Sequence, residues 1–130
     1  MDDSENPLIR GVESSDAAWA VLKAAVGSEN GMGFRPYLNP LDTGYFGASE
    51  ITLRDAFSSA SAIFYADEET LKQERMPVLC IDPAGQCQSF RVYAKDLWLV
   101  DNNVSIGNLL LEEIVEAQVV DGVLVSPDGL

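Results

Sequence analysis

Two short apolar segments joined by a turn constrain the fold of this chain more than any other feature. Residues 76–82 and 88–93 are rich in strand-forming side chains, and Ala84 and Gly85 lie between them. Such segments, separated by turn-forming residues, predict a β-hairpin. A turn centred on Ala84 and Gly85 places four apolar side chains on one face, which we expect to lie in the core: Leu79, Ile81, Phe90 and Val92.

This register also predicts the surroundings of Arg91 and of the two cysteines. Arg91 points to the face opposite the apolar side chains, where it pairs with a carboxylate or meets a partner. Cys80 faces Ser89, so the sulfur atoms of Cys80 and Cys87 lie diagonally, about 7 Å apart, which is too wide for easy bridging. Both thiols are therefore expected to be reduced. Their spacing is not the two-residue gap of a zinc or redox motif, and the chain has no histidine to complete a zinc site.

Further strands and helices are expected around the hairpin. Strands are predicted at residues 8–12, 34–38, 62–65 and 123–125, with Pro36 and Pro40 confining the second of them to an edge or cutting it short. A helix is predicted over residues 16–26. Three more are expected to begin at a capping box formed by Thr52 and Asp55, after Asp67, and after Asn108 as the N-cap. A single helical turn is predicted at residues 95–98. In the first helix Trp19, Leu22 and Val26 share one face.

This order of elements indicates the α+β class. We expect a mixed or mainly antiparallel sheet with two to three helices packed mainly on one face. The 130 residues fit one domain, residues 1–130, because two smaller units would each bury too little surface. Residues 1–6 and 126–130 are expected to be flexible ends.

Charge sets limits on the partners of the chain. It has 21 acidic and 8 basic residues and a net charge of −13. Such a surface repels phosphate backbones and anionic lipids, so direct binding to nucleic acid or membrane is not expected. Two interpretations stay open, because the charge serves solubility or attracts a basic protein. The chain begins without a signal-peptide pattern and has no run near the roughly 18 apolar residues of a membrane span, which predicts a cytoplasmic protein.

The absence of histidine argues against an enzyme. It removes Ser-His-Asp and Cys-His catalysis and most zinc sites, so no catalytic residue and no cofactor are assigned. A carboxylate can still act as an acid or base, and Asp82 or Asp101 near Arg91 is the first candidate. The alternative, which we favour, makes Asp82 a turn residue and Arg91 a cross-strand partner.

A polar segment after Trp98 partly matches the calcium-binding EF-hand loop. Four side chains fall at its first, third, fifth and twelfth positions: Asp101, Asn103, Ser105 and Glu112. The required glycine is displaced, because Ile106 stands at the sixth position and Gly107 follows it. The structural alternative is a loop in which Asn102 and Asn103 tolerate left-handed geometry and Asn108 caps the next helix.

The same segment resembles a family of short, acidic, uncharacterised bacterial proteins that are classified as a domain of unknown function. The resemblance lies in Phe90-Arg91-Val92, Trp98, residues 100–108 with their Asn-Asn-x-Ser-Ile-x-Asn pattern, and Glu112-Glu113. It extends more faintly to residues 16–19 and to the strand ending at Asp82, so it spans most of the chain. The resemblance implies no activity and no catalytic residue, because the family has none assigned.

These observations lead to two hypotheses of different classes. The first is a non-catalytic acidic module that occupies a basic protein, as an inhibitor or immunity-type protein does, with Trp98, Tyr45 or Phe46 as aromatic anchors. The alternative for Tyr45 and Phe46 is that both rings are buried as a loop plug. The second hypothesis is a small-molecule or divalent-ion site. The candidate binding residues under the two hypotheses are Asp101, Asn102, Asn103, Ser105, Asn108, Arg91, Trp98, Tyr45 and Phe46.

Overall fold

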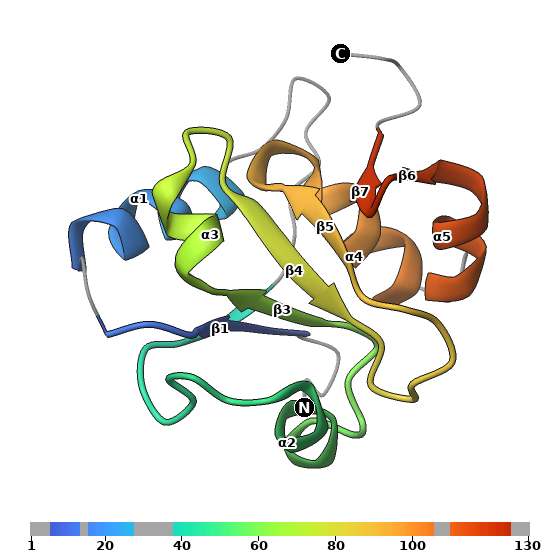
Figure 1. The fold of residues 1–130 in the computed structure, drawn as a ribbon, viewed down its shortest axis with the longest axis horizontal. Helices are drawn as coiled ribbons and strands as arrows, with labels where there is room; N and C mark the ends of the chain where they lie inside the picture. Colours follow the sequence, from blue (N-terminus) through green and yellow to red (C-terminus); the bar gives the residue numbers. More distant parts are fainter. Residues whose placement is uncertain (1–5, 14–15, 28–37, 106–109, 126–130) are drawn as a thin grey trace.

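The fold is built around one seven-stranded sheet with the strand order β2-β1-β3-β4-β5-β7-β6 (Figure 1). The computed structural model describes residues 6–13, 16–27, 38–105 and 110–125. Its strands are β1 (Asn6–Arg10), β2 (Leu38–Leu41), β3 (Ile63–Ala66), β4 (Pro77–Ile81), β5 (Phe90–Tyr93), β6 (Val119–Val120) and β7 (Val123–Leu124). Its helices are α1 (Asp16–Gly27), α2 (Glu50–Ala56), α3 (Glu68–Lys72), α4 (Leu97–Ser105) and α5 (Leu111–Gln118), and a 3₁₀ turn, η1 (Ala94–Asp96), precedes α4.

The sheet is mixed, which confirms the α+β class. Strand β1 runs parallel to β2 and β3, whereas β3, β4 and β5 pair antiparallel. The parallel pairs follow from the long helical connections through α1 and α2, since parallel strands need a crossover. Strand β7 is parallel to β5 and antiparallel to β6. The described residues form five α-helices, more than the two to three that were expected.

The helices pack mainly on one face, as predicted. Helices α1, α4 and α5 supply the larger core, with buried side chains that include Trp19, Leu22, Leu97, Val100 and Ile114. Helix α2 lies on the other face (Figure 1) and adds Leu53 to a smaller core. All four residues of β3 are buried, because this central strand is covered on both faces.

The hairpin forms as β4 and β5, but its expected register is wrong by one residue. Cys80 lies opposite Phe90 instead of Ser89, and Val78 lies opposite Val92. A slip of one residue moves every side chain of a strand to the other face. The larger core therefore receives Val78 and Cys80 together with Phe90 and Val92.

The connection between β4 and β5 explains this register. Residues 82–89 form a longer loop than a two-residue turn, and Asp82 organises it. The Asp82 carboxylate accepts hydrogen bonds from the backbone N–H groups of Ala84, Gln86 and Cys87, at 3.0, 2.9 and 3.2 Å. Leu79 and Ile81 consequently face the smaller core.

Several expected element ends also need correction. Ser49, and not Thr52, caps α2, because its hydroxyl accepts a hydrogen bond from the Thr52 N–H at 3.2 Å. The expected second strand is displaced to β2, at the sheet edge, and residues 34–37 lie outside the described residues. Asn6, which was expected to belong to a flexible end, is buried in β1. Residues 1–5 and 126–130 lie outside the described residues.

Asn108 also lies outside the described residues. Helix α5 instead begins after Leu110, whose N–H donates to the Glu113 carboxylate at 2.8 Å. None of the helices in the described ranges is long and apolar enough to cross a membrane.

Candidate binding surface

The polar segment after Trp98 is helical up to Ser105, so the expected loop is wrong for residues 101–105. Helix α4 buries Leu97, Val100 and Val104 against the sheet. These positions recur at helical spacing, and their burial outweighs the preference of asparagine for turns. Trp98 is half-buried, and Leu97 is the residue that packs fully into the core at this point.

Asp101 is a structural residue inside the protein. Its side chain is 1% exposed and accepts a hydrogen bond from Nδ2 of Asn6 at 2.8 Å. The side-chain Oδ1 of Asn6 in turn accepts from the backbone N–H groups of Ser61 and Ala62, at 3.0 and 3.2 Å. This network joins α4 to β1 and to the start of β3. In a buried setting such bonds are costly to break.

The described polar residues of this segment that follow Asp101 belong to the same helix. Asn103 donates from Nδ2 to the Leu99 carbonyl oxygen at 2.7 Å, within the same helix, and Asn102 is half-buried. Ser105 ends α4, and Asn108 lies outside the described residues. In the part of the chain that the structure describes, no group of three or more His, Cys, Asp or Glu side chains is arranged to hold a metal ion.

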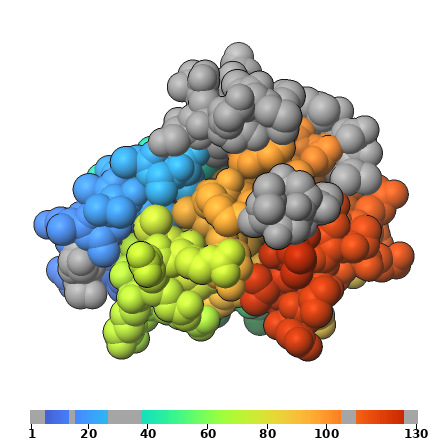
Figure 2. All heavy atoms as spheres, turned by 90° about the horizontal axis from the view of Figure 1, so that it is seen from above, coloured from blue at the N-terminus to red at the C-terminus, as the bar shows by residue number. Residues whose placement is uncertain are grey.

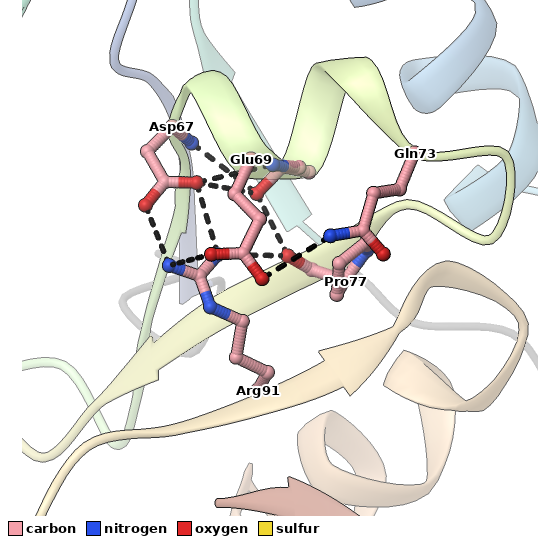
Figure 3. A network of polar contacts seen from close by, with 6 residues as sticks. Asp67, Glu69, Gln73, Pro77 and Arg91 are labelled. Atoms are coloured by element: carbon pink, nitrogen blue, oxygen red, sulfur yellow. Dashed lines mark hydrogen bonds and ion pairs between the residues drawn. The ribbon is translucent and has the colours of Figure 1, made fainter.

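Arg91 lies on the face opposite Phe90, as predicted, and pairs with a carboxylate. That carboxylate is Asp67, and the two side chains form a pair of hydrogen bonds at 2.9 and 2.8 Å (Figure 3). Arg91 also donates to the Pro77 carbonyl oxygen at 3.1 Å and lies 3.4 Å from Glu69. Arg91 is not paired with Asp82 or Asp101, and Asp82 instead organises the β4–β5 loop, in line with its favoured interpretation as a turn residue.

The Asp67 carboxylate also caps α3 through the Thr70 N–H, at 3.1 Å. Burial raises the pKa of Asp67, but hydrogen bonds from Arg91 and Thr70 outweigh burial and hold this pKa below its ordinary value. The hydrogen bond to Asp67 likewise raises the pKa of Arg91. Because the partners satisfy one another, we assign this network to stability.

The two thiols are free, as expected. Burial raises the pKa of Cys80, which is enclosed in the core. Burial and the neighbouring Asp82 carboxylate raise the pKa of Cys87 to about 11. A thiol is nucleophilic only as the thiolate, so neither cysteine is suited to nucleophilic chemistry.

The two aromatic residues of the segment 42–49 differ: Tyr45 is packed against the protein, whereas Phe46 is exposed. Tyr45 is half-buried against the smaller core, with its ring centroid 5.2 Å from that of Phe57. Phe46 is 40% exposed, and the Arg10 guanidinium lies 5.7 Å from the centre of its ring. Tyr45 therefore packs its ring under the loop, as the buried alternative predicted for both rings, and Phe46 remains accessible to a partner.

The distribution of charge along the chain marks a surface that the sequence analysis missed. After Lys95 the chain has seven acidic residues and no lysine or arginine: Asp96, Asp101, Glu112, Glu113, Glu116, Asp121 and Asp128. Counting charge by segment would have revealed this asymmetry. Of these residues, Glu112, Glu113, Glu116 and Asp121 are exposed on α5 and on the turn between β6 and β7.

Exposed apolar side chains accompany these carboxylates. Leu110 and Val120, which flank α5, are each 59% exposed. We call this region the α5 surface and define it by Leu110, Glu112, Glu113, Glu116, Val120 and Asp121. In Figure 2, α5 and the β6–β7 hairpin form one continuous region of the molecular surface. The α5 surface thus combines negative charge with apolar side chains.

A cavity of about 220 Å³ adjoins the α5 surface. Its walls come from the end of α4, the start of α5, the β4–β5 loop and the connection between α2 and β3, and include Ser61, Asp82, Gln86, Val104, Leu111 and Glu112. Two of these side chains, Asp82 and Glu112, carry carboxylates. We call it the acidic cavity.

The fold and this surface define the class of protein: a small α+β protein with an exposed face that combines carboxylates and apolar side chains. The chain belongs to the family described as a domain of unknown function, DUF6924, whose model matches residues 5–126. No curated protein matches the chain. Family membership agrees with the resemblance seen in the sequence and assigns no activity.

Proposed function

We propose that the protein is a non-catalytic binding module that occupies a basic protein partner through its α5 surface. The observation that supports the proposal is the exposure of Glu112, Glu113 and Glu116 on one helix, in a part of the chain without lysine or arginine. Uncompensated charge of one sign attracts a partner of the opposite sign and speeds association. An inhibitor or immunity-type protein acts in this way.

The apolar side chains give such a contact short-range stability. Charge alone is screened within about 10 Å at 0.1 M salt, whereas desolvated apolar side chains provide much of the affinity of an interface. Leu110 and Val120, which lie just before and just after α5, are exposed. A partner helix or loop that carries both basic and apolar side chains therefore fits the α5 surface.

The acidic cavity offers an anchoring position at the edge of this surface. A lysine or arginine side chain that enters it from the partner meets Glu112, which also belongs to the α5 surface, and Asp82. The Asp82 carboxylate already accepts three backbone N–H groups, so we expect Glu112 to make the stronger contact. A buried basic side chain with an acidic partner is a common hot spot in protein interfaces.

The test uses two variants that remove equal charge from different places. The first, called the α5 variant, replaces Glu112, Glu113 and Glu116 by glutamine. The glutamine at position 113 can still cap α5. The control replaces three other exposed acidic side chains outside α5: Glu13→Gln, Asp55→Asn and Glu68→Gln. Each tagged protein is used to capture proteins from its source cells at about 0.1 M and about 1 M salt, between which the Debye length falls from about 10 to about 3 Å.

The proposal predicts that one basic protein is retained by the wild type and by the control at the lower salt concentration. This protein is lost in the α5 variant and at the higher salt concentration. Equal retention by the α5 variant, equal loss in the control, or no retained protein at either salt concentration contradicts the proposal. Circular dichroism of each variant shows whether the fold is unchanged.

Three finer expectations belong to the proposal. The partner is met in the cytoplasm, the relatives are bacterial, and they share the pattern around Trp98 and residues 102–108. We also expect no direct binding to nucleic acid or to membranes, because the net charge is −13.

A further inference from the structure

A second cavity, of about 240 Å³, lies at the other end of the β4–β5 hairpin from the acidic cavity. It forms where the end of α1, the turn between α3 and β4, and η1 come together (Figures 1 and 2). Ala25, Met76 and Ala94 contribute apolar wall. The volume is below the roughly 300–1,000 Å³ of pockets that hold drug-sized ligands, so this cavity suits a small molecule.

One charged side chain of this cavity, Arg75, differs from the other described lysines and arginines in its partners. Most of the described lysines and arginines pair with carboxylates: Arg10, Lys23, Arg54, Lys72, Arg91 and Lys95. Arg75 makes no ion pair with any carboxylate of the described residues. Its guanidinium instead stacks on Tyr93, 3.8 Å from the ring centre. Stacking of this kind holds a guanidinium in place and leaves its edge free to bind an anion.

One of the cations at the cavity, Arg75, has no carboxylate partner among the described residues. Arg75 and Lys95 line it together with a single acidic side chain, Glu74. Lys95 pairs with Asp96 at 3.0 Å, so Arg75 is the main source of uncompensated charge.

The backbone keeps one wall of the cavity in a fixed position. Met76 has a φ of 52°, a left-handed conformation that is uncommon for residues other than glycine. Its N–H donates to the Gln73 carbonyl oxygen at 3.1 Å, and its own carbonyl oxygen accepts from the Ala94 N–H at 3.1 Å. Strained residues persist where their surroundings hold them and are frequent at binding sites.

We propose that this cavity binds a small organic carboxylate with an apolar body. The carboxylate pairs with the Arg75 guanidinium, whose planar geometry suits two parallel hydrogen bonds to two oxygens. The apolar body packs against Ala25, Met76 and Ala94. The site goes beyond the proposed function and does not depend on it, because it shares no residue with the α5 surface.

The test compares three probes of equal chain length by NMR of the ¹⁵N-labelled full chain: hexanoate, 1-hexanol and hexylamine. Hexanoate is expected to shift the amide signals of residues 74–76 and 93–95 and to bind at least tenfold more tightly than hexylamine. Arg75→Gln is expected to weaken hexanoate binding about tenfold, which equals about 1.4 kcal/mol. The control Lys72→Gln removes the same charge from an exposed position on α3 and should leave binding unchanged.

Three results would overturn the proposal. One is the absence of hexanoate binding, and another is binding of hexylamine as tightly as hexanoate. The third is an equal loss of affinity in the Lys72→Gln control, which would show that only the overall charge matters. The signals of unaffected residues report in the same spectra whether Arg75→Gln is folded. None of these results bears on the α5 surface.

Discussion

The bond between Asp67 and Arg91 offers the sharpest test of how this fold is held together. Replacing Asp67 by alanine removes two hydrogen bonds to Arg91 and the cap of α3. A lost cap costs about 1 kcal/mol, and lost hydrogen bonds to a charged group cost about 1.5–3 kcal/mol. Glu69, which lies 3.4 Å from Arg91, compensates for part of this loss. We therefore expect the free energy of unfolding to fall by about 2–3 kcal/mol.

Urea denaturation at neutral pH measures this loss, and Glu69→Ala is the matched control. Glu69 is 52% exposed and makes one longer contact with Arg91, so its removal should cost below about 0.5 kcal/mol. The reasoning is wrong if Glu69→Ala costs as much as Asp67→Ala, or if Asp67→Ala costs less than about 1 kcal/mol. Either result would mean that Arg91 does not depend on Asp67.

The pKa of Asp67 adds a dependence on pH. Folding lowers this pKa below the ordinary value of 3.8, so the folded state favours the ionised carboxylate. The resulting stability is present above pH 3.8 and is lost as the pH falls through the folded pKa. The difference between wild type and Asp67→Ala should therefore shrink in acid. A difference that stays constant to the lowest pH at which the protein is folded would contradict this linkage.

Three further predictions follow from the buried polar network and from the thiols. Asn6→Ala removes the hydrogen bonds to Asp101 and to two backbone N–H groups, so it should lower the free energy of unfolding by about 2–4 kcal/mol in urea or thermal denaturation. A loss near zero would refute the structural role of Asn6. Millimolar calcium should leave the melting temperature unchanged, because Asp101 is buried in α4 and bonded to Asn6; a rise would revive the ion hypothesis. Cys80 and Cys87 should react slowly with a thiol reagent at pH 8 and quickly in urea, since burial protects the first and the second has a pKa of about 11; rapid labelling of the folded protein would show that one thiol is activated.

Elements set by a local pattern of side chains were predictable from the sequence. The apolar spacing of Trp19, Leu22 and Val26 predicted α1, and all three residues are buried. The apolar residues 123–125 predicted a last strand, which forms as β7 over residues 123–124. Such features depend on residues a few positions apart, so a sequence window contains all the information needed.

Where a prediction failed, a distant contact decided the outcome. The asparagines of residues 101–105 favoured a loop, but burial of Leu97, Val100 and Val104 made the segment helical. The register of β4 and β5 depended on the hydrogen bonds of Asp82 within a longer loop. Neither effect is visible in the local composition.

The same division applies to the candidate sites. The net charge of −13 and the absence of histidine are properties of the sequence by itself, and the proposal of a binding module starts from them. The tertiary structure decided which charges remain available, because an ion pair needs two side chains in one place. Arg91 is neutralised by Asp67, 24 residues away, whereas Arg75 stacks on Tyr93 beside a cavity. Counting residues gives the total charge, but only the folded chain determines which charges face one another and which face the solvent.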